Sequence, residues 1–568
     1  MTLPRPASSP ATDAAASLLA DLIAHGVRDL VLSPGSRSQA LALAAVRLAD
    51  AGDLRVHVRI DERVAGFTAL GLARETGVPA AVLCTSGTAA ANLLPAAMEA
   101  FHAGVPLLLL TADRPPELRG IGANQATTQP GMFASWVRES VDAPVPGESG
   151  AGDDWSGLAV RAVAIALGAD APHGLPGVAG PVHLNLPARE PLSGEPVVVP
   201  ITSGTAPMPA PREPVVLARG LRTVVIAGAD AGPDAEEIAH AGSWPLIAEI
   251  VSGARFGRHL VHGYRALLRR ADLGGAVERA VVLGHPTLSR EVAALLARPD
   301  VEVIAVRHGG EELDLNHRSR AAASVVAAPS DDDDRAADRT WLGAWLEASA
   351  AQAVDLSERA PDHDGLASTD SATRRDAVRA ELEAVRRPLD RELLVDAVWR
   401  ATWPHDRLVF GSSRLVRVAD AVLGGKKVPV HANRGLAGID GTIATATGIA
   451  VASQAGGAAG VTRVLLGDLT LLHDVGALLL PPDETEPRLQ VIVGNDGGGT
   501  IFDGLEVAQV APAADLDRAF YTPHQVRLEH LALAYGWEYQ RVTTRTALDQ
   551  VLTRSVGGRQ LIEVPLAR

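Results

Sequence analysis

GDLTLLHDVGALLL (467–480) and VIVGNDGGGTIF (491–502) are the two halves of the stretch that decides the fold. The first half follows VTRVLL (461–466), an apolar and β-branched run that is typical of a buried strand. We predict a helix of about 12 residues after this strand, and then a second strand that ends before Asp496. Two strands joined through a helix lie parallel in one sheet, so Asp468 and Asp496 should both reach its carboxyl edge, where open α/β sheets bind ligands.

Two carboxylates at one sheet edge suit a hard cation that holds a diphosphate. Magnesium prefers about six oxygens, with phosphate and water oxygens commonly among them. Asp468 and Asp496 would each give one oxygen, and the glycines at 497–499, Gly498 among them, would let the backbone approach metal and phosphate. Either half alone is more often a plain strand-end turn or loop. The two halves together, across one strand–helix–strand unit, favour a metal and diphosphate site.

Composition limits the class of protein. The chain has 568 residues, enough for three or four domains, and 47% apolar but only 3% aromatic residues, so its cores must be built from Ala, Val and Leu. Its one cysteine, Cys84, rules out an intrachain disulfide and favours the cytoplasm. No apolar run approaches the ~18 residues of a membrane span. A net charge of −15 argues against nucleic acid as a partner but not against a small anionic substrate.

The first third carries several strand-to-helix junctions. SPGSRS (33–38) follows a predicted strand and places Ser36 and Arg37 at a helix N-terminus, which suits either an anion site or a plain turn. Glu62 follows the next strand and opens a helix, where a glutamate is often only a complement to the helix dipole. Gly66 and Gly71 on that helix predict close packing, for which another subunit is the candidate partner.

The layout of the opening stretch occurs a second time. A strand ending at Cys84 is followed by a small turn, a helix and a strand that ends at Asp113. Ser86 and Asp113 are separated by almost the same number of residues as Asp468 and Asp496. We infer an internal duplication in which Ser86 replaces the metal acid, so that only the C-terminal copy should hold metal. The polar loop that follows, RPPELRGIGANQATTQPGMF (114–133), begins with Arg114, and Asn124 and Gln125 are its candidate contact residues. Loops in that position commonly carry ligand contacts.

The middle of the chain reads as a smaller parallel sheet. A Pro/Ser/Thr-rich linker (201–215) precedes strands predicted at 223–227, 279–283 and 301–306. The turn GADAG (228–232) lacks G-x-G-x-x-G, so a dinucleotide site there is weakly supported. Arg290 lies in a loop after a strand, where it could face a ligand or solvent. The acidic run Asp331 to Asp334 is interpreted as a solvated linker, with a helical segment behind it.

The part of the last third that precedes residues 467–502 adds two more strands. The strand at 407–410 leads into GSSRLVR (411–417), with Ser413 and Arg417 at the start of a helix. The strand at 428–431 leads into ANRGLAGIDG (432–441), which carries Arg434 and Ile439. With a final strand at 560–564, the pattern predicts an α/β protein of three Rossmann-like parallel-sheet domains, the first and third related by duplication.

Motifs along nearly the whole chain resemble one enzyme family. SPGSRS, DERVAGF (61–67), TSGTAAAN (85–92), ADRPPELRGIGANQ (112–125), GSSRLVR, ANRGLAGIDG and the GDLT…NDGGGTIF stretch together look like the MenD family. These are thiamine-diphosphate-dependent 2-succinyl-5-enolpyruvyl-6-hydroxy-3-cyclohexene-1-carboxylate synthases. The match is specific, because ANRG-x-x-GIDG and ADRPPEL are not general features of thiamine-diphosphate decarboxylases.

The resemblance implies the domain plan and the assembly. It places a pyrimidine-binding domain at 1–200, a central domain without cofactor at 215–340, a helical linker at 341–385 and a diphosphate- and metal-binding domain at 386–568. It also implies a homodimer or a dimer of dimers, with thiamine diphosphate lying between two subunits. Glu62 of one subunit would then meet the aminopyrimidine, while the Asp468 and Asp496 site of the other holds the diphosphate through Mg²⁺ or Mn²⁺.

The resemblance further assigns roles to single residues. It implies decarboxylation of 2-oxoglutarate and conjugate addition of the resulting four-carbon unit to isochorismate, in menaquinone biosynthesis. The catalytic positions it implies are Glu62, Gln125 and Arg417. Cofactor contacts would come from Glu62, Ser413, Ile439, Gly467, Asp468, Gly498, Ile501 and Phe502, and metal contacts from Asp468, Asp496 and Gly498. The two substrates carry four carboxylates, which would bind Ser36, Arg37, Arg114, Asn124, Gln125, Arg290, Arg417 and Arg434.

Several alternatives stay open on the sequence alone. Asp496 stands where the wider family often has asparagine, so Asn495 is the other candidate for the second metal ligand, and Arg290 stands where the pattern can be lysine. Another thiamine-diphosphate decarboxylase or carboligase, or a diphosphate-binding homologue without catalysis, would share part of the pattern. The sequence does not choose between dimer and tetramer, identify a feedback ligand, or match each arginine to a carboxylate.

Overall fold

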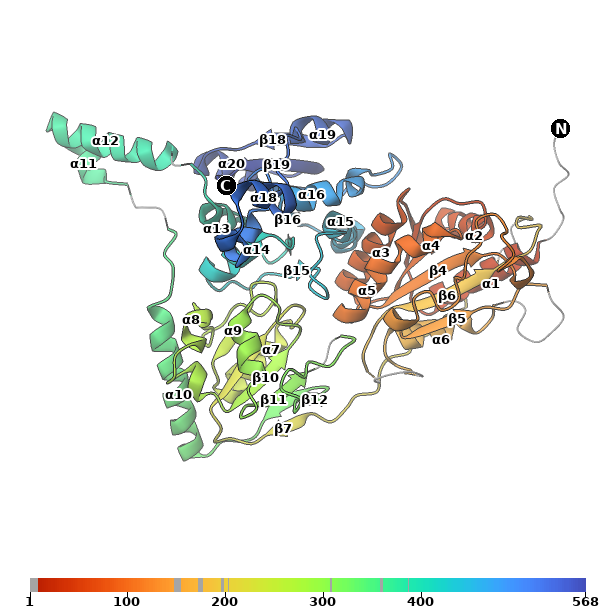
Figure 1. The fold of residues 1–568 in the computed structure, drawn as a ribbon, viewed down its shortest axis with the longest axis horizontal. Helices are drawn as coiled ribbons and strands as arrows, with labels where there is room; N and C mark the ends of the chain where they lie inside the picture. The colour runs from red at the N-terminus through yellow and green to blue at the C-terminus, as the bar shows by residue number, and fades with distance from the viewer. Residues whose placement is uncertain are drawn as a thin grey trace.

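Three parallel sheets, each covered by helices, make up the computed structural model of the chain (Figure 1). The structure describes residues 9–147, 155–171, 177–195, 199–202, 204–306, 309–357, 361–386 and 388–568. Within these ranges every strand pair of the three sheets is parallel, which confirms the predicted α/β class. None of the described helices is both long and apolar enough to cross a membrane.

The first and third sheets have the same strand order. The first runs β2-β1-β3-β4-β6-β5 and the third β15-β14-β16-β17-β19-β18, so each strand has a counterpart in the other sheet. The strands of the first sheet are β1 (Asp29–Leu32), β2 (Arg55–Val58), β3 (Ala80–Cys84), β4 (Leu107–Asp113), β5 (Glu139–Asp142) and β6 (Val182–Pro187). Those of the third are β14 (Arg407–Phe410), β15 (Val430–Ala432), β16 (Thr462–Gly467), β17 (Leu489–Asn495), β18 (Glu538–Arg541) and β19 (Arg559–Pro565). The shared order confirms the predicted duplication, with β3 and β4 matching β16 and β17.

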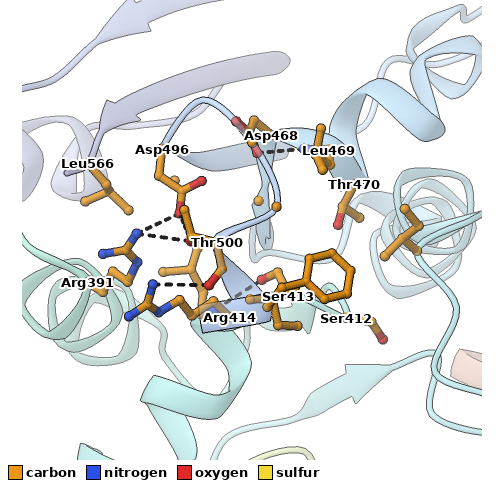
Figure 2. A pocket seen from close by; sticks show the side chains of 18 of the residues that line it. Arg391, Ser412, Ser413, Arg414, Asp468, Leu469, Thr470, Asp496, Thr500 and Leu566 are labelled. Atoms are coloured by element: carbon orange, nitrogen blue, oxygen red, sulfur yellow. Dashed lines mark hydrogen bonds and ion pairs between the residues drawn. The ribbon is translucent and has the colours of Figure 1, made fainter. Parts of the chain in front are cut away.

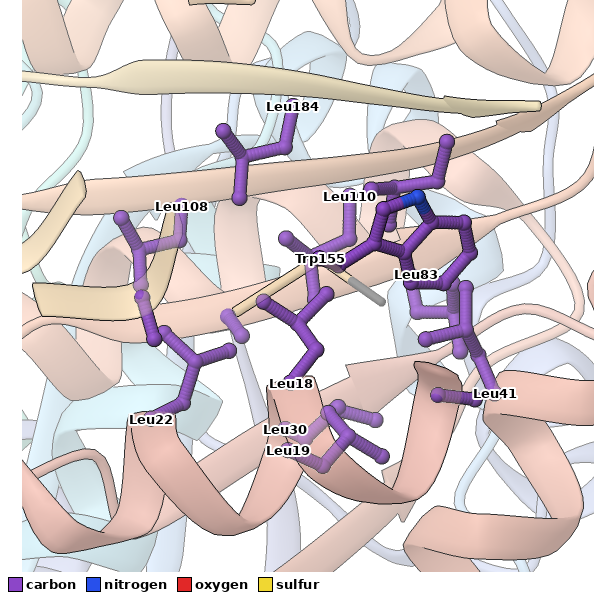
Figure 3. Packing of buried hydrophobic residues seen from close by; sticks show 14 of the residues in the cluster. Leu18, Leu19, Leu22, Leu30, Leu41, Leu83, Leu108, Leu110, Trp155 and Leu184 are labelled. Atoms are coloured by element: carbon purple, nitrogen blue, oxygen red, sulfur yellow. The ribbon is translucent and has the colours of Figure 1, made fainter. Parts of the chain in front are cut away.

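Helices cover the first and the third sheet. Around the first sheet lie α1 (Pro10–Ala24), α2 (Gln39–Asp50), α3 (Glu62–Thr76), α4 (Thr88–Asn92), α5 (Leu94–Ala103) and α6 (Leu158–Ala166). Around the third lie α13 (Arg391–Ala401), α14 (Arg414–Val422), α15 (Thr442–Ser453), α16 (Asp468–His473), α17 (Val507–Val510), α18 (Ala513–Leu516), α19 (Leu528–Ala534) and α20 (Arg545–Thr553). Figure 3 shows one resulting core, in which Leu18 and Leu22 of α1 pack against Leu83, Leu108 and other buried strand residues. Strands covered on both faces are largely apolar, as β3 and the first four residues of β4 are.

The central sheet is smaller, with the order β12-β11-β10-β8-β9. Its elements are β8 (Thr223–Ala227), β9 (Leu246–Ala248), β10 (Arg279–Leu283), β11 (Glu302–Val306), β12 (Arg320–Ala322), α7 (Asp234–Gly242), α8 (Tyr264–Leu268) and α9 (Arg290–Leu296). A separate two-stranded ribbon pairs β7 (Val215–Leu217) with β13 (Val325–Ala327). The helices α10 (Asp332–Ala350), α11 (His363–Ala367) and α12 (Ser371–Arg386) then lead to the third sheet (Figure 1).

Three local predictions are wrong, and the first is the loop position of Arg290, which is the first residue of α9 with Ser289 as its cap. The helix after β16 ends at His473 and is followed by a 3-10 turn (Val475–Leu478), because the Asp474 carboxylate accepts N–H bonds from Ile443 and Ala444 of α15. The acidic run at 331–334 is not a linker, since Asp331 caps α10 and the following acids form its first turn, where negative charge suits the helix dipole. Helix α10 also crosses residue 340, and the domain limits stay a prediction.

Helices α3 and α15 join the first and third sheets within one chain. A Cβ on Gly71 would lie 2.0 Å from the Thr445 carbonyl oxygen, and a Cβ on Gly448 would lie 2.2 Å from the Thr68 carbonyl oxygen. Only glycine allows two backbones to approach this closely. The close packing predicted for Gly71 is therefore present, but its partner is a helix of the same chain rather than another subunit.

Candidate active site

A cavity of about 280 Å³ lies at the carboxyl ends of β14, β16 and β17 (Figure 2). It is lined by all eight residues of the third sheet's domain that were predicted to contact cofactor or metal: Ser413, Ile439, Gly467, Asp468, Asp496, Gly498, Ile501 and Phe502. The parallel register of β16 and β17 brings the two strand ends together, since Gly467 pairs with Gly494. The sequence prediction of a shared sheet edge is thus confirmed as geometry, while the ligand contacts themselves stay predictions.

Asp468 opens α16 at the floor of this cavity. Its carboxylate is buried and accepts hydrogen bonds from the Leu469 N–H (2.8 Å) and from His524 Nε2 (3.0 Å). The pKa of Asp468 is raised, first by burial and next by the negative charge of Asp496, and these two hydrogen bonds offset only part of the rise. A buried carboxylate repelled by a second one is a site that a cation would stabilise.

Asp496 faces the same cavity from the end of β17 (Figure 2). Its Oδ2 accepts hydrogen bonds from Arg391 (2.7 Å) and from the Thr500 hydroxyl. Asn495 does not line the cavity. Its amide instead donates to Glu563 (2.8 Å) and accepts the Gly497 N–H (3.1 Å). The geometry therefore favours Asp496 over Asn495 as the second ligand.

The glycine loop after β17 has a shape that side chains would obstruct. Gly498 has φ +155°, and a Cβ there would lie 2.4 Å from the Tyr521 carbonyl oxygen. The neighbouring Gly499 N–H donates to that same oxygen at 2.7 Å. The loop is thereby fixed against the π-helical segment Asp517–Tyr521, and Gly498 and Gly499 line the same cavity as Asp468.

The donor set fits a divalent cation bound together with a diphosphate. Among the described residues no group of three or more His, Cys, Asp and Glu side chains could hold a metal by itself. Two carboxylates and a backbone carbonyl leave the remaining positions of a magnesium ion to water and phosphate oxygens, which is the usual arrangement for this ion. The repulsion between Asp468 and Asp496 also favours a bound cation, because a positive charge between the two carboxylates would offset it.

The predicted residues of the first sheet form a second group, and none of them lines the cavity. Gln125 (φ +55°) donates to the Ser86 carbonyl (3.0 Å), and the Ser86 hydroxyl donates to the Gln125 carbonyl (2.8 Å), which ties the 114–125 loop to the end of β3. Arg37 is buried and its N–H donates to Thr85 Oγ1 (3.3 Å). Glu62 is the first residue of α3.

The other members of this group also follow strands of the first sheet. Ser36 and Asn124 are exposed, and Arg114 is half-buried at the end of β4, with its Nε lacking a hydrogen-bond partner. Because all these residues lie beyond the carboxyl ends of β1 to β4, they occupy the edge that corresponds to the cavity edge of the third sheet.

The three remaining arginines lie around the third sheet and the central sheet. Arg434 is buried, donates from Nε to Thr287 Oγ1 (2.9 Å) and from NH1 to the cavity residue Ser412 (3.2 Å). The pKa of Arg417 is lowered, first by partial burial and then by the nearby charges of Arg265 and Arg290. Arg290 itself is exposed and lies 3.7 Å from Glu506. Clustered cations of this kind suit an anionic ligand.

Sequence reasoning missed several cavity residues. Arg391, Ser412, Thr470 and Thr500 line the cavity, and His524 hydrogen-bonds Asp468. Arg391 and His524 lie far from their partners in the chain, so no local spacing could have indicated them. Thr500 directly follows the glycine run, and a hydroxyl beside a predicted phosphate site was a usable signal.

Comparisons with known proteins agree with this geometry. Residues 12–134 match the family model described as "Thiamine pyrophosphate enzyme, N-terminal TPP binding domain". A curated 2-succinyl-5-enolpyruvyl-6-hydroxy-3-cyclohexene-1-carboxylate synthase from Leifsonia xyli is 53% identical over 100% of this chain and 98% of its own.

The chain belongs to the 2-succinyl-5-enolpyruvyl-6-hydroxy-3-cyclohexene-1-carboxylate synthase family.

A second member of this synthase family, from Clavibacter michiganensis, is 52% identical over 100% of this chain and 98% of its own. Among solved structures, benzoylformate decarboxylase from Polynucleobacter necessarius matches with a TM-score of 0.64 over 98% of both chains. Its identity of 15% makes it evidence for the fold alone. The curated relatives confirm the family that the motifs predicted, and the solved structure confirms the fold.

Proposed function

We propose that this chain decarboxylates 2-oxoglutarate and adds the remaining four-carbon unit to isochorismate, using thiamine diphosphate and a divalent cation, Mg²⁺ or Mn²⁺. The product would be 2-succinyl-5-enolpyruvyl-6-hydroxy-3-cyclohexene-1-carboxylate, the compound after which its relatives are named. The observation that carries the proposal is the convergence of Asp468, Asp496 and the glycine loop on one cavity with the buried Arg434 beside it.

Each cavity residue has a task that its position supports. Asp468 and Asp496 would hold the cation, and the Gly498 carbonyl would add a third oxygen. Ser413, whose side chain caps α14, would hydrogen-bond the diphosphate end, and Ile439 would support the cofactor rings. When bound, thiamine diphosphate supplies the electron sink that allows a 2-oxoacid to lose carbon dioxide.

The first-sheet group would complete the site from a second subunit. All six predicted residues of this group, Glu62 among them, lie outside the cavity of their own chain. We therefore propose a homodimer, or a dimer of dimers, in which Glu62 of one subunit holds a proton at the aminopyrimidine N1′ of the cofactor bound by the other. Arg37, Arg114, Gln125 and Asn124 would bind substrate carboxylates and hydroxyls there.

The arginines favour this function over related ones. Two dianionic substrates need several cations. Small apolar 2-oxoacids would offer no second carboxylate to Arg434 and Arg417, whose pKa values burial lowers. Arginine binds carboxylates with two parallel hydrogen bonds, so the pair suits dicarboxylic acids. A homologue that only binds diphosphate would have no use for Glu62.

Glu62→Gln tests the proposal. We expect the variant to bind thiamine diphosphate measurably but to release no carbon dioxide from 2-oxoglutarate, because an amide cannot hold the exchangeable proton. Glu237→Gln, which changes an exposed glutamate in the first turn of α7, is the matched control and should keep full activity. Undiminished carbon dioxide release by Glu62→Gln would overturn the assigned role and leave only the helix-dipole explanation.

A further inference from the structure

A buried glutamate of the central sheet holds a loop that reaches the cavity edge. Glu249 follows β9 and has no exposed surface. Its two carboxyl oxygens accept the backbone N–H groups of Thr287 (3.0 Å) and Leu288 (2.7 Å), in the loop between β10 and α9. One carboxylate that accepts two neighbouring N–H groups fixes both the position and the direction of this loop.

The same loop orients an arginine of the third sheet's domain. Thr287 accepts from Arg434 twice, through its hydroxyl from Nε (2.9 Å) and through its carbonyl from NH2 (3.2 Å). The third nitrogen, NH1, donates to the hydroxyl of Ser412, which lines the cavity. The guanidinium is therefore held by hydrogen bonds to neutral groups. Burial lowers its pKa, and the nearby acids that counter this, Glu249 first, accept none of these three hydrogen bonds, so the guanidinium can still pair with an anion.

Glu249 costs the fold stability rather than adding to it. The pKa of its carboxyl is raised to about 8, first by burial and then by the negative charge of Asp420, although the two N–H groups and Arg434 lower it. A buried carboxyl that is expensive to ionise is poorly explained as a stabilising contact. Its effect on the geometry of the loop is the better explanation.

We propose that Glu249 and Thr287 are positioning residues that hold the Arg434 guanidinium at the cavity edge for a substrate carboxylate. The inference rests on the proposed function and names two residues of the central sheet that act in it. Neither residue lines the cavity, so each would act only through Arg434. The smaller sheet thereby contributes to substrate binding without itself touching the cofactor.

Thr287→Val is the sharpest test. Valine keeps the shape and the N–H that Glu249 binds, but it removes the hydroxyl that accepts from Arg434. We expect the KM for one of the two acids to rise about tenfold, as for the loss of one hydrogen bond to a charged group. The KM for the other acid and the apparent affinity for thiamine diphosphate should stay unchanged, and Thr287→Ser should restore the wild-type KM.

A double-mutant cycle separates positioning from general damage. In an Arg434→Gln background Thr287→Val should have no further effect on KM, because its partner is gone. Glu249→Gln should raise the same KM. Asp338→Asn, which alters another buried carboxyl of the central region, paired with Arg219, should not. An unchanged KM for both acids in Thr287→Val, or a rise that persists without Arg434, overturns the inference. A wild-type chain that forms no product from the two acids overturns the proposed function as well.

Discussion

Replacing Asp468 with asparagine should have opposite effects on the empty chain and on the cofactor-bound chain. In the empty chain the Asp468 carboxylate is buried and repelled by Asp496. Asparagine removes that charge while its amide oxygen still accepts the Leu469 N–H. Because the folded pKa of Asp468 lies above its unfolded value, ionised Asp468 destabilises the fold at neutral pH. The variant without cofactor should therefore unfold at the same or a higher temperature.

Cofactor binding should change in the other direction. The variant loses one of two carboxylates that face the proposed cation. Removing one partner of a buried charge pair costs on the order of 3 kcal/mol, which is roughly a 100-fold weaker Kd. The loss should appear only with the metal present, since chelation removes the interaction from the wild-type chain too. Asp406→Asn, at a buried carboxylate that pairs with Arg463 outside the cavity, is a control that should keep metal-dependent binding.

The assay is a calorimetric titration with thiamine diphosphate, in Mg²⁺ and in chelator, for the wild-type chain and both variants. Thermal unfolding without cofactor gives the second reading. Equal affinity with and without Mg²⁺ in the wild-type chain would refute the metal site. A clearly lower unfolding temperature of empty Asp468→Asn would refute the argument from charge repulsion.

Two further predictions concern packing and pH. Gly71→Ala should lower the free energy of unfolding in urea by about 3 kcal/mol, because the new Cβ would clash with the Thr445 carbonyl and the backbone would have to shift. Gly343→Ala in α10, which has open space around it, is the control and should be neutral or slightly stabilising. An equal effect of both substitutions would contradict the packing argument. Burial raises the pKa of Asp474 to about 7, so the folded chain binds this proton more tightly than the unfolded chain and stability should fall as pH rises from about 4 to 7. Asp474→Asn should flatten that part of the unfolding profile, and an unaltered profile would show that Asp474 does not titrate there.

The fold was predictable because its signals are local and repeated. Apolar strands such as β3 and β16 end in small residues, and each is followed by a helix and another strand, which is enough to predict a parallel sheet. The duplication could be inferred without residue identity, because the two strand–helix–strand units have nearly the same spacing, and the shared strand order confirms it. The residues that the sequence predicts for a metal and diphosphate site line one cavity in the structure.

The parts that were missed depend on contacts between distant segments. The helix beginning at Asp468 is short because Asp474 turns to α15, about 30 positions earlier, and no pattern within 468–480 shows that. Close approach at Gly71 was predictable from its lack of a side chain, but the partner helix was not. Arg391 and Glu249 act through Asp496 and Thr287, which lie in other elements. Sequence spacing predicts which residues reach a sheet edge, while their neutralising and supporting partners follow only from packing.

Product analysis is the most direct test of the proposed function. The purified chain is incubated with 2-oxoglutarate, isochorismate, thiamine diphosphate and Mg²⁺, and the mixture is analysed by mass spectrometry. We expect one new compound whose mass equals that of both substrates less one carbon dioxide, formed only when cofactor and metal are both present. Carbon dioxide release without this compound, or no consumption of either acid, would contradict the function proposed for the cavity.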